Sequence, residues 1–106
     1  MPARALPADV VASLRAAFAE ELVERLPRLR RAACEAKEPN ERRDPDLRTL
    51  AVRDAHTLGS SAYVVGEPEA AHLARRAEAL LTDDADADEL GAAVDALDAA
   101  LKRWRP

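Results

Sequence analysis

Apolar residues recur every three or four positions through almost the whole of this 106-residue chain. That spacing places them along one face of an α-helix, whereas a half-buried strand alternates at every second position. The composition agrees, because 25 of the 51 hydrophobic residues are Ala and 14 are Leu, both strong helix formers. Only 7 Val and 3 Thr are β-branched, and Gly occurs 3 times, too few for a sandwich or barrel. The sequence therefore predicts an all-α fold with a slim, leucine-rich core.

Two polar segments, 38–45 and 82–86, interrupt the periodic sequence. The helices between and around them can bury their apolar faces together only as an antiparallel bundle. We therefore expect one four-helix bundle domain over residues 1–106, with a short or kinked N-terminal helix. The first helix is predicted to open near Asp9, and Pro27 inside it predicts a kink or two helices meeting there. The start at Met1 and the complete set of helices favour a free-standing domain, and we expect a monomer.

The later helices carry clear start and stop signals. Asp44-Pro45 is an N-cap followed by proline at the first helical position, Gly66 is suited to a left-handed cap, and Pro68 opens the next helix. The expected inward positions, in chain order, are Val10, Val11, Leu14, Phe18, Leu22, Leu26, Leu29 and Ala33; Leu47, Leu50, Ala51, Ala55, Leu58, Ala62 and Val65; Ala70, Leu73, Ala74, Ala77, Leu80 and Leu81; and Leu90, Ala93, Val94, Leu97, Leu101 and Trp104.

Several classes of protein are disfavoured by composition. The longest run without charge, 55–66, is too short and too polar for a membrane span, and no long apolar stretch follows Arg4 as a secretory signal requires. A single cysteine, Cys34, allows no internal disulfide and no cysteine-based metal site, so we expect a cytoplasmic protein. The net charge of −4 disfavours nucleic-acid binding, and no glycine-rich phosphate loop is present for ATP.

The second predicted helix has an unusual outer face around a histidine. On a helical wheel His56 falls about 160° from the core residue Leu58. Thr49, Val52, Gly59, Ser60 and Tyr63 share that outer face, which is nearly uncharged in a chain that is 34% charged. Glycine inside a helix costs about 1 kcal/mol relative to alanine. Close approach of another macromolecule to the imidazole would explain such a face.

The segment 55–62, Ala-His-Thr-Leu-Gly-Ser-Ser-Ala, followed by Gly66, resembles the signature of histidine-containing phosphotransfer (HPt) domains. The resemblance extends over most of the chain, since 18–29 is similar to the family's first long helix and 70–81 to the helix beside the histidine. Family members are antiparallel four-helix bundles, which agrees with the periodicity. The family usually has Lys where Gly59 stands and Gly where Ser60 stands, and the loop 34–44 is longer than usual.

The resemblance implies that His56 is the phosphoacceptor of a two-component phosphorelay. It also implies that Glu78, 22 residues later, hydrogen-bonds one ring nitrogen and leaves the other as nucleophile. The partners implied are response-regulator receiver domains and sensor histidine kinases, and the receiver would supply the Asp, the Mg²⁺ and a Lys. On the bare pattern Glu78 is equally well an ordinary surface carboxylate. We expect Val52, Gly59, Ser60 and Tyr63 to form an exposed docking face.

Two hypotheses that assign the chain to another class of protein remain open. Gly59 in the place of the family's lysine allows a degenerate adaptor that binds a receiver or kinase without phosphotransfer. The seam from Leu90 to Trp104 allows a plain helical dimerisation module. In the leading interpretation the chain is a phosphoryl carrier rather than a kinase, and it needs no cofactor of its own.

Overall fold

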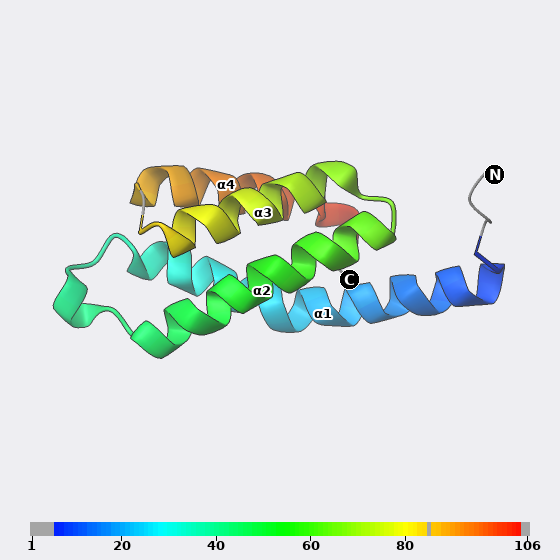
Figure 1. The fold of residues 1–106 in the computed structure, drawn as a ribbon, viewed down its shortest axis with the longest axis horizontal. Coiled ribbons are helices and arrows are strands. Elements are labelled where there is room, and N and C mark those ends of the chain that lie inside the picture. The colour runs from blue at the N-terminus through cyan, green and yellow to red at the C-terminus, as the bar shows by residue number, and fades with distance from the viewer. Residues whose placement is uncertain (1–5, 85, 105–106) are drawn as a thin grey trace.

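Four helices form an antiparallel bundle in the computed structural model, which describes residues 6–84 and 86–104 (Figure 1). Successive helices run in opposite directions, and each packs against two others, so that α1, α2, α3 and α4 close a ring around one core. The described residues contain no strand. The predicted all-α four-helix bundle is thus confirmed. The bounds of its elements are α1 Ala8–Glu35, η1 Asn40–Arg42, α2 Pro45–Val64, α3 Pro68–Thr82, α4 Ala87–Ala100 and η2 Lys102–Trp104.

The helix ends follow the signals in the sequence. The Asp44 carboxylate accepts a hydrogen bond of 2.9 Å from the backbone N–H of Asp46 at the start of α2. Gly66 has φ +83°, the left-handed conformation that glycine adopts without strain. The Glu67 N–H bonds the Ala62 carbonyl at 2.8 Å, and the Gly66 N–H bonds the Tyr63 carbonyl at 3.2 Å. This pair is a Schellman motif, which ends α2 and turns the chain into α3.

Leucine and alanine fill the core, as the periodicity predicts. Burial lowers the free energy of the folded state roughly in proportion to the apolar area removed from water. The buried residues are Phe18, Leu22, Leu26, Leu29, Ala32, Ala33, Leu47, Ala51, Ala55, Leu58, Ala62, Ala70, Ala71, Ala74, Ala77, Leu81, Leu90, Ala93, Val94, Leu97 and Leu101.

Three expectations for the first two helices are wrong. Val10, Val11 and Leu50 are 39%, 38% and 41% exposed rather than buried. α1 spans 28 residues and its first turns extend beyond the other helices, so Val10 and Val11 have no helix to pack against (Figure 1). Leu50 lies at the rim of the apolar face of α2, about 80° from Leu58 on the wheel.

The first helix is also neither short nor split. It begins at Ala8, before the predicted Asp9 N-cap, and continues without a break through Pro27. Proline removes the N–H that would bond the carbonyl of Val23. Val23 and Pro27 both face solvent, where water can take the place of the missing donor.

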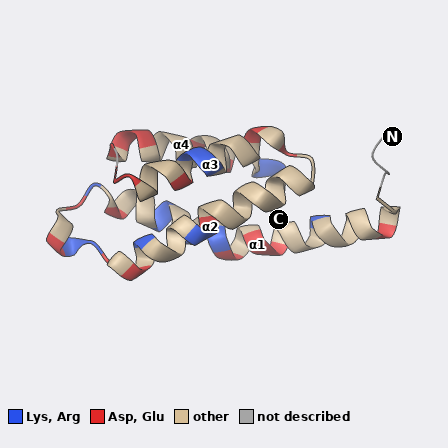
Figure 2. Ribbon diagram, viewed as in Figure 1, with Lys and Arg blue, Asp and Glu red and all other residues tan. Residues whose placement is uncertain are grey.

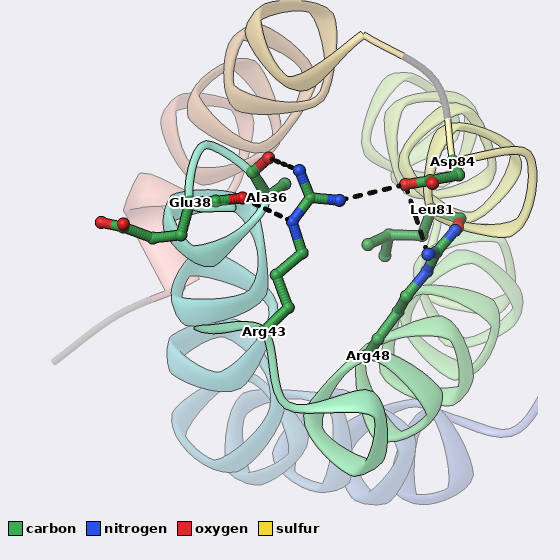
Figure 3. A network of polar contacts seen from close by, with 6 residues as sticks. All are labelled: Ala36, Glu38, Arg43, Arg48, Leu81 and Asp84. Carbon is green, nitrogen blue, oxygen red and sulfur yellow. Dashed lines mark hydrogen bonds and ion pairs between the residues drawn. The ribbon is translucent and has the colours of Figure 1, made fainter. Parts of the chain in front are cut away.

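Two arginines close one end of the bundle (Figure 3). The Arg43 guanidinium donates to the carbonyls of Glu38 and Ala36, each at 2.7 Å, beyond the end of α1. Arg48 donates from Nε to the Leu81 carbonyl at 3.0 Å, near the end of α3. Both arginines also pair with Asp84, at 3.4 and 3.3 Å. They bind backbone carbonyls at and just beyond the ends of two helices and fix the loop between α1 and α2.

The other end is closed by Trp104 in η2. Its ring packs edge-on against Phe18 at a centroid distance of 4.9 Å, and the Arg15 guanidinium lies 4.4 Å from the ring centroid. The indole N–H donates to Glu67 at 3.0 Å. Trp104 thereby joins the C-terminal turn to α1 and to the junction between α2 and α3.

One buried charge joins α1 to α2. The side chain of Asp54 is 1% exposed and accepts from Arg28 Nε and Nη2, both at 2.8 Å, and from Arg25 Nη1 at 2.9 Å. The bond to Asp54 raises the pKa of the Arg28 guanidinium, so this cation stays charged. A bidentate arginine–carboxylate pair has a fixed geometry as well as a favourable energy, so it sets the position of α2 on α1.

Removing this carboxylate should destabilise the bundle. We expect Asp54→Ala to lower the free energy of unfolding by about 3 kcal/mol, because two arginines lose their charged acceptor at a buried position. Asp95→Ala on the exposed face of α4 is the matched control, with an expected change within about 0.5 kcal/mol. Urea unfolding followed by circular dichroism measures both values, and equal stabilities would show that the buried pair contributes nothing.

Candidate functional site

His56 lies in the middle of α2 and points away from the core. Its side chain is 68% exposed. No charged residue occurs from Ala55 to Gly66, so the second half of α2 is free of charge in Figure 2. The imidazole is therefore accessible, and α2 carries no charge on its C-terminal side, whereas Arg53 of α2 and Glu78 of α3 place charges beside it.

Small residues let α2 and α3 approach each other closely on one side of this histidine. Ala55 and Ala62 on α2 and Ala70, Ala74 and Ala77 on α3 are all fully buried. Alanine keeps the two backbones near each other, since it adds only a methyl group between them. A side chain at the edge of α3 can consequently reach one on α2.

Glu78 of α3 makes this contact with His56. Imidazole Nδ1 lies 3.1 Å from Oε2 and 3.3 Å from Oε1 of the carboxylate. An ionised carboxylate only accepts hydrogen bonds, so Nδ1 is the nitrogen that carries the proton. The lone pair of the neutral ring then lies on Nε2, on the side of the ring away from Glu78. The Glu78 side chain is 28% exposed, so it is partly shielded from water.

The placement of Gly59 differs from the sequence prediction. We expected it in the exposed docking face, but it is buried against α3. A Cβ at this position would lie 3.4 Å from Arg75 Cγ, 3.5 Å from the Ala71 carbonyl oxygen and 3.6 Å from Ala74 Cβ. The wheel places position 59 about 100° from Leu58, and α3 covers that flank. Gly59 therefore serves the packing of α2 on α3 and is not part of the open face.

The other three residues of the predicted docking face divide into two groups. Ser60 is exposed, and Tyr63 is 66% exposed. Val52 is only partly exposed because it also packs against the core. An open face around His56 thus includes Ser60 and Tyr63 fully and Val52 in part.

A shallow groove that the sequence analysis missed lies beside His56 and extends from Glu78 of α3 to α1. Arg25 and Arg28 from α1 and Arg53, Asp54 and Thr57 from α2 line it together with the imidazole. Asp54 could have indicated this feature, because the wheel places it about 40° from Leu58, inside an otherwise apolar stripe. A charged residue at such a position needs a partner from the helix packed against it.

The described residues, 6–84 and 86–104, hold no group of three or more His, Cys, Asp or Glu side chains that could bind a metal ion. The site thus consists of an exposed imidazole, a carboxylate on Nδ1, and the arginines Arg25, Arg28 and Arg53 in the groove toward α1.

Comparison with known families agrees with this arrangement. A family model described as "Hpt domain" matches residues 13–105, and the chain therefore belongs to the Hpt domain family. Hpt domains are phosphotransfer modules of two-component signalling that interact with receiver domains or kinases. No curated protein and no solved structure matches the chain. In the part of the chain that the structure describes, no helix has the length and apolar character needed to cross a membrane.

Because Gly59 is buried and Ser60 is exposed, a large side chain should destabilise the bundle at position 59 but not at position 60. Gly59→Trp would force an indole against α3 and should lower the free energy of unfolding by about 2 kcal/mol or more. Ser60→Trp adds the same side chain to an exposed position and should change it by about 0.5 kcal/mol at most. Thermal unfolding distinguishes the variants, and equal midpoints would mean that position 59 is open to solvent.

Proposed function

We propose that this Hpt domain carries a phosphoryl group on His56 between receiver aspartates, or from a sensor kinase to a receiver. The observation that carries the proposal is the imidazole itself, which is 68% exposed and bound through Nδ1 to Glu78. Phosphoryl transfer proceeds through a loose transition state, so catalysis depends mainly on positioning and on neutralising charge. An oriented, accessible nucleophile is what such a module must contribute.

The tautomer with its proton on Nδ1 determines which nitrogen reacts in the transfer step. The Nε2 lone pair attacks phosphorus of an aspartyl phosphate, the new N–P bond forms, and the P–O bond to the aspartate breaks. The bonding electron pair leaves with the aspartate as a carboxylate. The proton stays on Nδ1, and the ring acquires a positive charge beside the Glu78 carboxylate. Glu78 thus supports the product in two ways, by holding the ring orientation and by pairing with its charge.

The partner is proposed to supply the rest of the chemistry. A receiver domain brings its aspartate, Mg²⁺ and lysine to His56, so this chain needs no ATP site and acts as a carrier rather than a kinase. Ser60 and Tyr63, with Val52 at the edge, are the residues we propose for docking, because they are uncharged, wholly or partly exposed, and on the same side of α2 as His56. Such a relay operates in the cytoplasm, between intracellular kinases and receivers.

Labelling with radioactive phosphate tests the acceptor. Incubation with kinases and ATP, or with phosphorylated receivers, should label the wild type with an acid-labile, base-stable phosphate. His56→Gln should remove the label, and His72→Gln, a change of the chain's other histidine, should leave it unchanged. A label that survives His56→Gln would overturn the proposal. A wild type that binds its receiver as tightly as His56→Gln does and takes no label would instead establish the phosphorylation-independent adaptor.

The contribution of Glu78 is separable from that of His56. We expect Glu78→Ala to slow phosphorylation of His56 about tenfold, since the ring loses the acceptor that fixes Nδ1. Glu78→Gln should retain more of the rate than Glu78→Ala, because its amide oxygen still accepts from Nδ1 but carries no charge. Rapid-quench measurement of the labelled protein gives these rates, and identical rates for all three proteins would make Glu78 an ordinary surface carboxylate.

A further inference from the structure

The phosphorylated histidine creates an electrostatic problem that the chain must solve. A phosphoryl group carries nearly two negative charges at neutral pH. On Nε2 it would share a ring with Nδ1, and Nδ1 lies only 3.1 Å from the Glu78 carboxylate. The Glu78 carboxylate offsets the positive charge of the ring, but not the negative charge of a phosphoryl group on the opposite ring nitrogen. Stabilising the phosphorylated state therefore calls for a cation on this face of α2.

Most arginines near His56 are already paired. Arg25 and Arg28 bind Asp54, and Arg76 pairs with Glu89 of α4 at 3.8 Å. Two remain, Arg53 on α2 and Arg75 on α3. Both are exposed, and neither guanidinium forms an ion pair or hydrogen bond with any residue of 6–84 or 86–104.

Arg75 differs from Arg53 because its side chain is anchored on the helix that carries His56. Its Cγ lies 3.4 Å from the point where a Cβ of Gly59 would be, so the stem of the arginine packs against α2 at this position. Its guanidinium carbon lies 5.8 Å from the centroid of the Tyr63 ring. A side chain that is already partly ordered loses less conformational entropy when it binds an anion.

The anchored position also lies within reach of the imidazole. Gly59 follows His56 by three residues, and positions three apart on a helix have Cβ atoms about 5–6 Å apart. Rotation about the outer bonds of Arg75 moves its guanidinium along α2 from Tyr63 toward His56. The contact with Tyr63 is a weak one at an exposed site, whereas a guanidinium and a phosphoryl group form strong, bidentate hydrogen bonds.

We propose that Arg75, anchored against Gly59, supplies the guanidinium that binds the phosphoryl group carried on Nε2 of His56. This assignment rests on the proposed function, because it requires a phosphohistidine. Gly59 is then the point on α2 against which the stem of Arg75 packs. In the unphosphorylated protein the guanidinium then contacts the Tyr63 ring.

The test uses potassium phosphoramidate, a small phosphodonor, so that docking of a receiver does not enter the measured rate. The N–P bond of the donor breaks, the N–P bond to Nε2 forms, and ammonia leaves. We expect Arg75→Gln to lower the rate constant for phosphorylation of His56 about tenfold, the effect of one lost charge-assisted hydrogen bond. Arg76→Gln is the matched control, with the same charge change one residue away, and should stay within about twofold of the wild type.

Two further variants separate binding of the phosphoryl group from a structural effect. The double variant Gly59→Lys, Arg75→Gln returns a cation to the same place from α2 and should recover most of the lost rate. Arg53→Gln tests the competing arginine and should resemble Arg76→Gln. Circular dichroism melts confirm that each variant is folded.

The possible outcomes are distinct. Equal rates for Arg75→Gln and Arg76→Gln would overturn the role of Arg75 while leaving His56 as the acceptor. A slow Arg53→Gln beside a normal Arg75→Gln would also overturn it and would assign the phosphoryl-binding cation to α2. A wild type that takes no phosphoryl group on His56, with the same labelling as His56→Gln, would overturn both this proposal and the proposed function.

Discussion

The contact between α2 and α3 is made by residues with almost no side chain, and the site around His56 depends on it. The residues in this contact are all buried: on α2 they are Ala55, Gly59 and Ala62, and on α3 they are Ala70, Ala71, Ala74 and Ala77. Because the backbones meet closely, Glu78 reaches the imidazole and the stem of Arg75 packs against Gly59. A leucine in this seam would separate the helices and with them the carboxylate from the ring. The alanine-rich composition is in this sense a requirement of the site as well as of the fold.

A second contact, on the opposite flank of α2, fixes the helix against α1. Asp54, two residues before His56, is held by Arg25 and Arg28. A buried ion pair adds little net stability compared with an apolar substitute, but it specifies geometry, because a misplaced charge would remain unpaired in the core. The alanines fix α2 against α3 on one side, and this ion pair fixes it against α1 on the other. The rotation of α2 about its own axis is therefore set, and His56 points to solvent.

The periodicity of the sequence was enough to predict the four-helix bundle, the caps at Asp44 and Gly66 and the outward direction of His56. The family resemblance added Glu78, whose carboxylate the structure places on Nδ1. The helical wheel failed for Gly59, because a wheel gives a direction from one helix and does not show which flank a neighbouring helix covers. It failed for Val10 and Val11 because periodicity carries no information on where the partner helices begin. Asp54 was visible on the apolar stripe, but its two partners lie 26 and 29 residues away, a distance that local patterns do not bridge.

The central claim is that packing of α2 on α3 commits Nδ1 of His56 to Glu78 and leaves Nε2 to react. Nuclear magnetic resonance of the phosphorylated protein, labelled with nitrogen-15 in histidine, identifies the nitrogen bonded to phosphorus through its coupling. We expect coupling of phosphorus to Nε2 and a proton retained on Nδ1. Phosphorus bonded to Nδ1 of His56 would contradict it, because the nitrogen assigned to Glu78 would then be the nucleophile.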